Sequence, residues 1–205
     1  MQNIEKEILT RFRKAGRGSL FFNSDFIRLG SAKAVNKALE RLVEKGELLR
    51  IARGIYTRPK LSRLMGPVKP PIQDIAKAIA KRDRAKIIPT GAMALYQLGL
   101  STQIPLKIVY LTNGSPRSIN IEKFRIIFKK TSQKNLAIQG EASVLAIQAL
   151  KEIGKGNCTD QQRKIIIEVL KKENPYKLEH DIRLAPEWIR QIMKEALNNG
   201  KVAKP

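Results

Sequence analysis

Residues 31–46 read SAKAVNKALERLVEKG and carry the clearest structural signal in the chain. Val35, Leu39 and Leu42 recur at the spacing of one face of an α-helix, and polar side chains occupy the remaining positions. Ser31 is a suitable N-cap residue, and Gly46 suits the left-handed position that follows a helix C-terminus. The pattern predicts a helix from Ser31 to about Lys45.

The residues after this helix, 47–58, read ELLRIARGIYTR. Residues 48–52 and 55–57 are rich in β-branched and other apolar residues, and the dipeptide Arg53-Gly54 separates them. A strand, a tight turn and a second strand are therefore predicted.

The residues before the helix complete a recognisable order of elements. Ile4, Ile8 and Phe12 share one face of a predicted helix, residues 19–22 are short and extended, and a short helix follows as far as Leu29. Helix, strand, helix, helix and hairpin is the order of a winged helix-turn-helix. We predict such a DNA-binding domain over residues 1–58.

In this interpretation residues 31–45 form the recognition helix, and the hairpin is the wing. The first turns of a recognition helix meet base edges in the major groove, where Asn pairs with adenine and Lys donates to guanine. Cations further along the helix and on the wing contact phosphate or enter the minor groove. The predicted DNA-binding residues are Ser31, Lys33, Asn36, Lys37, Arg41, Arg50, Arg53 and Arg58.

A simpler interpretation exists for each of these cations, because exposed Lys and Arg on a core-facing helix are usually only solvated. The element order, the arginines of the hairpin and a net charge of +8 over residues 1–60 together favour DNA binding. Tyr56 and the nearby phenylalanines are expected in the core, which argues against stacking on single-stranded bases.

Residues 59–71 hold four prolines and one glycine. This composition does not sustain a helix and lacks strand periodicity, so a linker is predicted there. Residues 72–205 are expected to form a mixed α+β domain with a small sheet and several helices, so the whole chain is of the α+β class. Predicted strands are 85–89, 107–112, 119–121 and 124–130; predicted helices are 72–81, 90–98 (capped by Thr90), 140–154, 159–172 and 185–199.

The net charge of the chain is +22, and it is unevenly distributed. Residues 1–60 carry +8, residues 61–135 carry +11, and residues 136–205 carry +3. Since 42% of the residues are hydrophobic, a folded surface is expected to carry the excess. Such a surface attracts polyanions, nucleic acid above all.

Composition also excludes several classes of protein. One cysteine, Cys158, and one histidine, His180, exclude a disulfide framework and a multi-histidine metal centre. We expect His180 to be a solvated surface residue. No apolar run approaches the roughly 18 residues of a membrane span. A cytoplasmic, non-enzymatic protein without a cofactor or a membrane partner is predicted.

Residues 113–117, NGSPR, allow two interpretations. Their backbone amides, a hydroxyl and Arg117 could hold an anion, whereas a plain Asn-Gly turn between strands is the simpler expectation. Arg17, Arg63 and Arg117 are candidates for additional phosphate contacts.

Five stretches in the same order along the chain resemble AbiEi-family antitoxins of type IV toxin–antitoxin systems. The more specific stretches are 90–105 (TGAMALYQLGLSTQIP) and 110–117 (YLTNGSPR); the others are 34–48, 52–56 and 183–189. The resemblance implies an N-terminal winged helix that represses its own operon at inverted-repeat operators. It also implies a C-terminal domain that opposes a nucleotidyltransferase-like toxin, and it assigns no individual contact residue.

Three alternatives to this function stay open. The protein could be a transcriptional regulator with no toxin role. The wing domain could dock on a protein partner while its charge is incidental. The basic region 61–135 could bind RNA.

Overall fold

The computed structural model describes residues 4–64 and 66–202. The chain divides into two compact units, Met1–Ile79 and Ala80–Pro205. The division falls inside helix α3 (Ile72–Arg82), whereas the sequence placed the domain boundary in residues 59–71. The fold is mixed α+β, with small sheets and several helices, as the sequence predicted.

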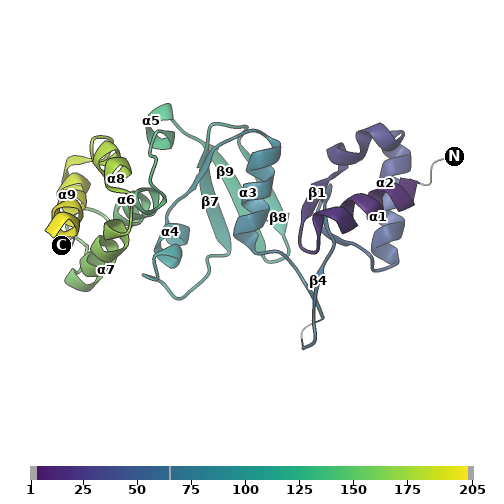
Figure 1. Ribbon diagram of the computed structural model, residues 1–205, viewed down its shortest axis with the longest axis horizontal. Helices are drawn as coiled ribbons and strands as arrows, with labels where there is room; N and C mark the ends of the chain where they lie inside the picture. Colours follow the sequence, from purple (N-terminus) through teal and green to yellow (C-terminus); the bar gives the residue numbers. More distant parts are fainter. Residues whose placement is uncertain (1–3, 65, 203–205) are drawn as a thin grey trace. The chain divides into compact units, whose positions relative to one another are not determined.

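The first unit begins with α1 (Ile4–Ala15), β1 (Leu20–Phe22) and the 3-10 helix η1 (Asn23–Leu29) (Figure 1). Helix α2 (Ala32–Glu44) and the hairpin of β2 (Leu49–Ala52) and β3 (Ile55–Thr57) follow. The three strands form one antiparallel sheet in the order β1-β3-β2. The predicted helix 31–45 and hairpin are confirmed within one residue.

Local chemistry sets the ends of α2. The Ser31 hydroxyl oxygen accepts a hydrogen bond from the amide of Ala34, which satisfies one of the free N–H groups of the first turn. Gly46, with φ of 71°, lies just beyond the C-cap Lys45 and reverses the chain toward β2.

The core of the first unit lies between its helices and its sheet. Phe12 and Phe26 are fully buried, with ring centroids 5.8 Å apart, and the Phe21 ring lies 4.3 Å from that of Phe12. The expectation that the aromatic side chains are core residues is confirmed for Phe12, Phe22, Phe26 and Tyr56. The other buried apolar residues of this core are Ile8, Val35, Ala38, Leu39, Leu42 and Leu48.

The segment predicted as an irregular linker contains a hairpin instead. Strands β4 (Lys60–Ser62) and β5 (Gly66–Val68) pair antiparallel as a separate two-stranded sheet. Each strand has three residues, too few for alternation to be read from the sequence, and Pro67 is tolerated because a two-stranded sheet has only edges. Leu61 is 64% exposed in this hairpin.

The second unit contains a four-stranded sheet in the order β6-β7-β9-β8. Its strands are β6 (Ile87–Pro89), β7 (Lys107–Thr112), β8 (Arg117–Ile121) and β9 (Phe124–Lys130). Strand β9 lies between β7 and β8 in the sheet. It runs parallel to β7 and antiparallel to β8. All four predicted strands exist: β7 and β9 have the predicted ends, β6 starts two residues later than predicted, and β8 starts two residues earlier.

Helices α6 (Glu141–Ile153), α7 (Asp160–Lys171), α8 (Pro175–Ile182) and α9 (Glu187–Val202) gather beside the sheet, with the short α4 (Ala92–Gln97) and α5 (Gln133–Leu136) (Figure 1). The sequence predicted neither α5, which has only four residues, nor α8, whose buried apolar residues are only Leu178 and Ile182 in a charged stretch. Buried residues of this helical core include Ala94, Ile147, Leu150, Ile166, Leu170, Leu178, Ile189 and Met193.

The predicted cap of α4 is wrong. The N-cap residue is Gly91, which makes no side-chain cap. The hydroxyl of Thr90 donates instead to the carbonyl of Val109 on β7, at 3.2 Å. Thr90 therefore ties the end of β6 to the sheet, which is a tertiary role that local sequence does not reveal.

Candidate nucleic-acid interface

One face of α2 is exposed and basic. Lys33, Asn36 and Lys37 lie on it, opposite the buried Val35 and Leu39. Neither lysine forms an ion pair or hydrogen bond with any residue in the described part of the chain. Both ammonium groups are consequently available to a ligand in solution. Ser31 is also exposed, although its oxygen already caps the helix.

Asn23 connects this face of α2 to the turn of the β2–β3 hairpin. Its side-chain Nδ2 donates to Oδ1 of Asn36 at 2.7 Å, and its backbone N–H donates to the carbonyl of Gly54 at 3.2 Å. Arg53 precedes Gly54 in that turn and is exposed. The hairpin turn and the first half of α2 are thus neighbours, as a shared ligand surface requires.

Arg50 is the other exposed cation of the hairpin. It lies on β2 opposite Tyr56 of β3, and it has no hydrogen-bond partner among the described residues. Burial raises the pKa of the Tyr56 phenol, and the positive charge of Arg50 acts against that increase. We call the group Lys33, Asn36, Lys37, Arg50 and Arg53 the α2–hairpin surface.

The second half of α2 differs, because its cations are paired. The Glu5 carboxylate of α1 contacts Arg41 at 3.3 Å and Lys45 at 2.7 Å. The hydrogen bond from Lys45, followed by that from Arg41, lowers the pKa of Glu5 despite an opposing effect of burial. Arg41 was predicted to contact phosphate. Its positive charge is partly neutralised by Glu5, although its side chain is 53% exposed.

Three predicted arginines lie away from the α2–hairpin surface. Arg58 follows the last residue of β3, at the opposite end of that strand from the hairpin turn, and its carbonyl accepts from the amide of Gly18 at 2.7 Å. Arg17 donates from Nη1 to the carbonyl of Pro59 at 2.8 Å. Arg63 is exposed in the turn between β4 and β5. The structure does not bring these three together with Lys33 and Asn36.

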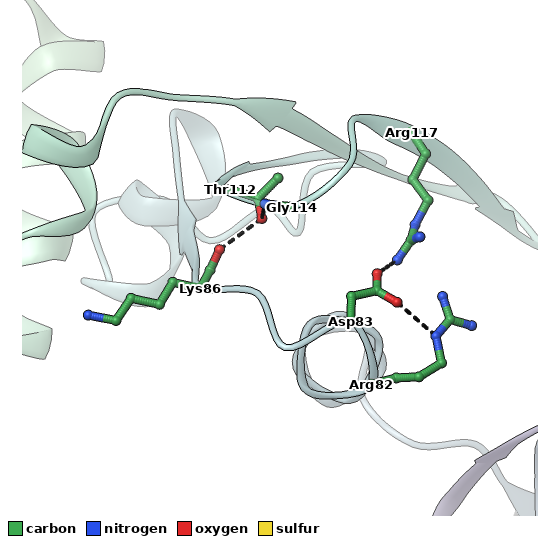
Figure 2. Close-up of polar contacts among 6 residues, drawn as sticks. All are labelled: Arg82, Asp83, Lys86, Thr112, Gly114 and Arg117. Atoms are coloured by element: carbon green, nitrogen blue, oxygen red, sulfur yellow. Dashed lines mark hydrogen bonds and ion pairs between the residues drawn. The ribbon is translucent and has the colours of Figure 1, made fainter.

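Arg117 in the second unit forms an ion pair with Asp83 rather than facing solvent alone (Figure 2). The other carboxylate oxygen of Asp83 accepts from Arg82 at 2.9 Å. The Arg117 guanidinium also lies over the ring of Phe128, 5.5 Å from its centroid, and burial lowers its pKa. An anion at Arg117 would have to compete with the Asp83 carboxylate.

The rest of the 113–117 turn is tied to the residue before β6. Asn113 Oδ1 accepts from the amide of Lys86, and the hydroxyl of Thr112 donates to the carbonyl of Lys86, each at 2.8 Å. The same hydroxyl oxygen accepts from the amide of Gly114 (Figure 2). A Cβ on Gly114 would lie 2.8 Å from that of Ala85, so the close approach requires glycine. These contacts fit the simple turn interpretation.

His180 is partly exposed, and its Nδ1 lies 2.9 Å from Oδ1 of Asp181. Asp181 is fully buried, and its two oxygens accept from the amides of Gln139 and Gly140 at the start of α6. The Asp181 carboxylate therefore stabilises a helix N-terminus, a role that the sequence did not suggest. Within residues 4–64 and 66–202, no cluster of His, Cys, Asp and Glu could hold a metal ion, and no helix is long and apolar enough to cross a membrane.

Comparisons with known proteins place the chain without assigning a role. A model described as a family of unknown function, DUF6088, matches residues 7–178. No curated protein matches the chain. Among solved structures, the RV2827C protein from Mycobacterium tuberculosis is similar at 11% sequence identity with a TM-score of 0.48, over 98% of this chain and 78% of that one.

Proposed function

We propose that this chain, which belongs to the DUF6088 family of unknown function, binds double-stranded DNA through the α2–hairpin surface. In this proposal the elements from α1 to β3 act as a winged helix-turn-helix, with α2 as the recognition helix. The observation that carries the proposal is the group of unpaired cations on the first half of α2, next to the hairpin turn.

The physical basis is the attraction between free cations and phosphates. Each Lys or Arg that neutralises a phosphate releases condensed counterions, and this release favours binding most strongly at low salt. Lys33 and Lys37 lose no intramolecular ion pair on binding DNA, whereas Arg41 would have to leave Glu5. The first half of α2 and the hairpin are therefore the favoured contacts.

We further propose an antitoxin that represses its own operon, with inverted-repeat operator DNA as the partner. The resemblance of residues 90–105 and 110–117 to AbiEi-family antitoxins supports this part. The second unit would then oppose a nucleotidyltransferase-like toxin. An adjacent reading frame that encodes such a toxin would support the antitoxin role, and its absence would favour a regulator with no toxin role.

The direct test is a salt titration of DNA binding by the full chain, with the DNA upstream of its own gene as the probe. We expect Arg50→Ala and Arg53→Ala each to weaken binding to any duplex and to reduce the salt slope by about one. Lys33→Ala and Asn36→Ala should lower discrimination between this probe and unrelated duplex DNA.

The matched control is Lys164→Ala on α7, which removes one exposed positive charge outside the α2–hairpin surface. It should leave both affinity and salt slope near those of the wild type. Wild-type behaviour of all four surface variants would show that the DNA-binding face is assigned wrongly.

A second candidate function is RNA binding through the sheet of the second unit. Lys107 on β7 and Arg125 on β9 are in register, and Lys129 lies on the same face of β9. All three are exposed, and Arg125 donates to the hydroxyl of Ser118 on β8 at 3.3 Å. Competition by double-stranded RNA as strong as that by the upstream DNA would favour this function over DNA binding.

A further inference from the structure

Asn23 contacts both parts of the α2–hairpin surface, yet it carries no charge and lies outside α2. It is the first residue of η1, directly after β1. Its backbone binds Gly54 in the hairpin turn, and its side chain binds Asn36 on α2. Gly54 has a φ of 74°, and a Cβ there would lie 3.4 Å from Asn23 Oδ1. The carboxamide of Asn23 is thus packed against the turn while it holds Asn36.

The hydrogen bond fixes the orientation of the Asn36 carboxamide. Since Asn23 Nδ2 is the donor, the oxygen of Asn36 faces Asn23, and Nδ2 of Asn36 has no partner among the described residues. A carboxamide oxygen has two lone pairs, so Oδ1 of Asn36 can accept one further hydrogen bond. Asn36 therefore offers two N–H donors and one acceptor site to a ligand.

We propose that Asn23 is a positioning residue for base recognition, and that it holds Asn36 ready to bind adenine. In that contact Nδ2 of Asn36 donates to N7 of adenine, and Oδ1 accepts from the N6 amino group. The inference rests on the proposed function, because it concerns the DNA contacted by the α2–hairpin surface. A carboxamide that is already held in one orientation loses no further rotational freedom when DNA binds, so the entropic cost of binding is smaller.

A purely structural role for the Asn23 side chain is the competing explanation. Its Oδ1 is buried and accepts no hydrogen bond from the described residues, an arrangement that opposes folding. Its hydrogen bond to Asn36 lies at an exposed site. The side chain thus contributes little that would stabilise the fold, and its clearest effect is on the orientation of Asn36.

The test is selection from a randomised duplex DNA library by the full chain, followed by sequencing of the bound fraction. The wild type and Asn36→Ala should differ at one position of the enriched site, where the wild type prefers adenine by about tenfold. Asn23→Ala should reduce the preference at that same position. The double variant with both changes should match Asn36→Ala, because Asn23 acts through Asn36.

The substitution Asn23→Asp should change which base is preferred, whereas Asn23→Ala should only weaken the preference for adenine. A carboxylate cannot donate, so Asn36 should turn its Nδ2 toward residue 23 and present its oxygen to the groove. Cytosine, whose N4 amino group is a donor, should then gain at the position where adenine loses. The ratio between bases is the measurement, since the added negative charge lowers affinity for all sequences alike. Thermal melting of each variant confirms that it is folded.

Two results would overturn the inference while DNA binding stands. One is an adenine preference that disappears in Asn36→Ala but is unchanged in Asn23→Ala and Asn23→Asp. The other is an enriched site at which Asn36→Ala alters no position. A wild-type protein that retains no duplex at low salt would instead overturn the proposed function, and this inference with it.

Discussion

The α2–hairpin surface and the 113–117 turn both contain cations that the sequence offers as phosphate contacts, but these cations have different surroundings. Lys33 and Lys37 have no acidic partner in the described structure, whereas Arg117 is paired with Asp83 and stacked over Phe128. Residues 61–135 have the larger net charge, +11 against +8 for residues 1–60. Among the described residues, unpaired cations occur in residues 61–135 as well, such as Lys107 and Lys129, so net charge alone does not choose between the two regions. The proposal favours the α2–hairpin surface because its unpaired lysines lie next to the hairpin turn.

The same contrast recurs within α2. Its first half presents free ammonium groups, and its second half presents Arg41 and Lys45 to Glu5 of α1. The unpaired lysines therefore lie in the first half of α2, whereas the second half also carries Glu40 and Glu44. Four predictions test this division, in order of decreasing effect.

Charge reversal on the free half of α2 should have the largest effect. Lys33→Glu combined with Lys37→Glu should weaken duplex binding by about a hundredfold at low salt, because two attractive contacts become repulsive. Fluorescence anisotropy over a range of salt concentrations measures the change. The matched control, Lys155→Glu with Lys164→Glu, alters the net charge equally at exposed sites outside this surface. An equal loss in the control would mean that only total charge matters.

Removal of the Asp83 carboxylate, which pairs with Arg117, should lower the stability of the protein. Asp83→Ala leaves the half-buried Arg117 guanidinium without its partner, and we expect a loss of about 1–2 kcal/mol in the free energy of unfolding. Urea denaturation measures it. If the variant is as stable as the wild type and binds DNA several-fold more tightly, Arg117 is available to DNA. The division between paired and available cations would then be wrong.

Glu5→Gln should sharpen the contrast within α2. The substitution releases Arg41 and Lys45 from a carboxylate, so DNA affinity should rise a few-fold at low salt. The loss of these surface ion pairs should cost less than about 1 kcal/mol of stability. An electrophoretic mobility shift titration measures affinity, and Glu7→Gln, which removes an exposed carboxylate on the same helix, is the control. Equal gains in both variants would assign the effect to net charge.

The pH dependence of the Glu5 pairing should be the smallest effect. The folded-state pKa of Glu5 lies below its ordinary value of 4.5. Its contribution to stability is therefore complete above the unfolded-state pKa and is lost as the pH falls through the folded-state pKa. The difference in stability between wild type and Glu5→Gln should shrink on acidification below about pH 4.5, by less than about 1 kcal/mol. Melting temperatures across this range measure it; a difference that grows on acidification would contradict the pairing.

Elements with a clear apolar pattern and recognisable end signals were predictable, and those without them were not. Helix α2 was located to within a residue because Ser31, four buried apolar residues and Gly46 define its start, face and end. Helix α5 escaped because it has only four residues, and α8 escaped because its buried apolar residues are only Leu178 and Ile182 in a charged stretch. The β4–β5 hairpin escaped because its prolines and glycine indicated a linker. Thr90 was misassigned because its hydroxyl binds Val109, a residue 19 positions away.

For the candidate interface, the sequence identified the residue types but not their neighbours. Lys33, Asn36 and Arg53 could be named from the helix period and the hairpin turn. Asn23 could not, because its role depends on the 2.7 Å contact with Asn36 across 13 residues of chain. A polar residue at the start of a short helix is ordinarily interpreted as a cap.

The sequence by itself determined the α+β class, the order of elements in the first unit, the apolar face of α2 and the excess of positive charge. These features follow from local periodicity, capping residues and composition. Only the tertiary structure decided which cations are available, because Glu5 with Arg41 and Asp83 with Arg117 are far apart in sequence. Ion pairing acts through space over a few ångströms, and the fold brings these charges together.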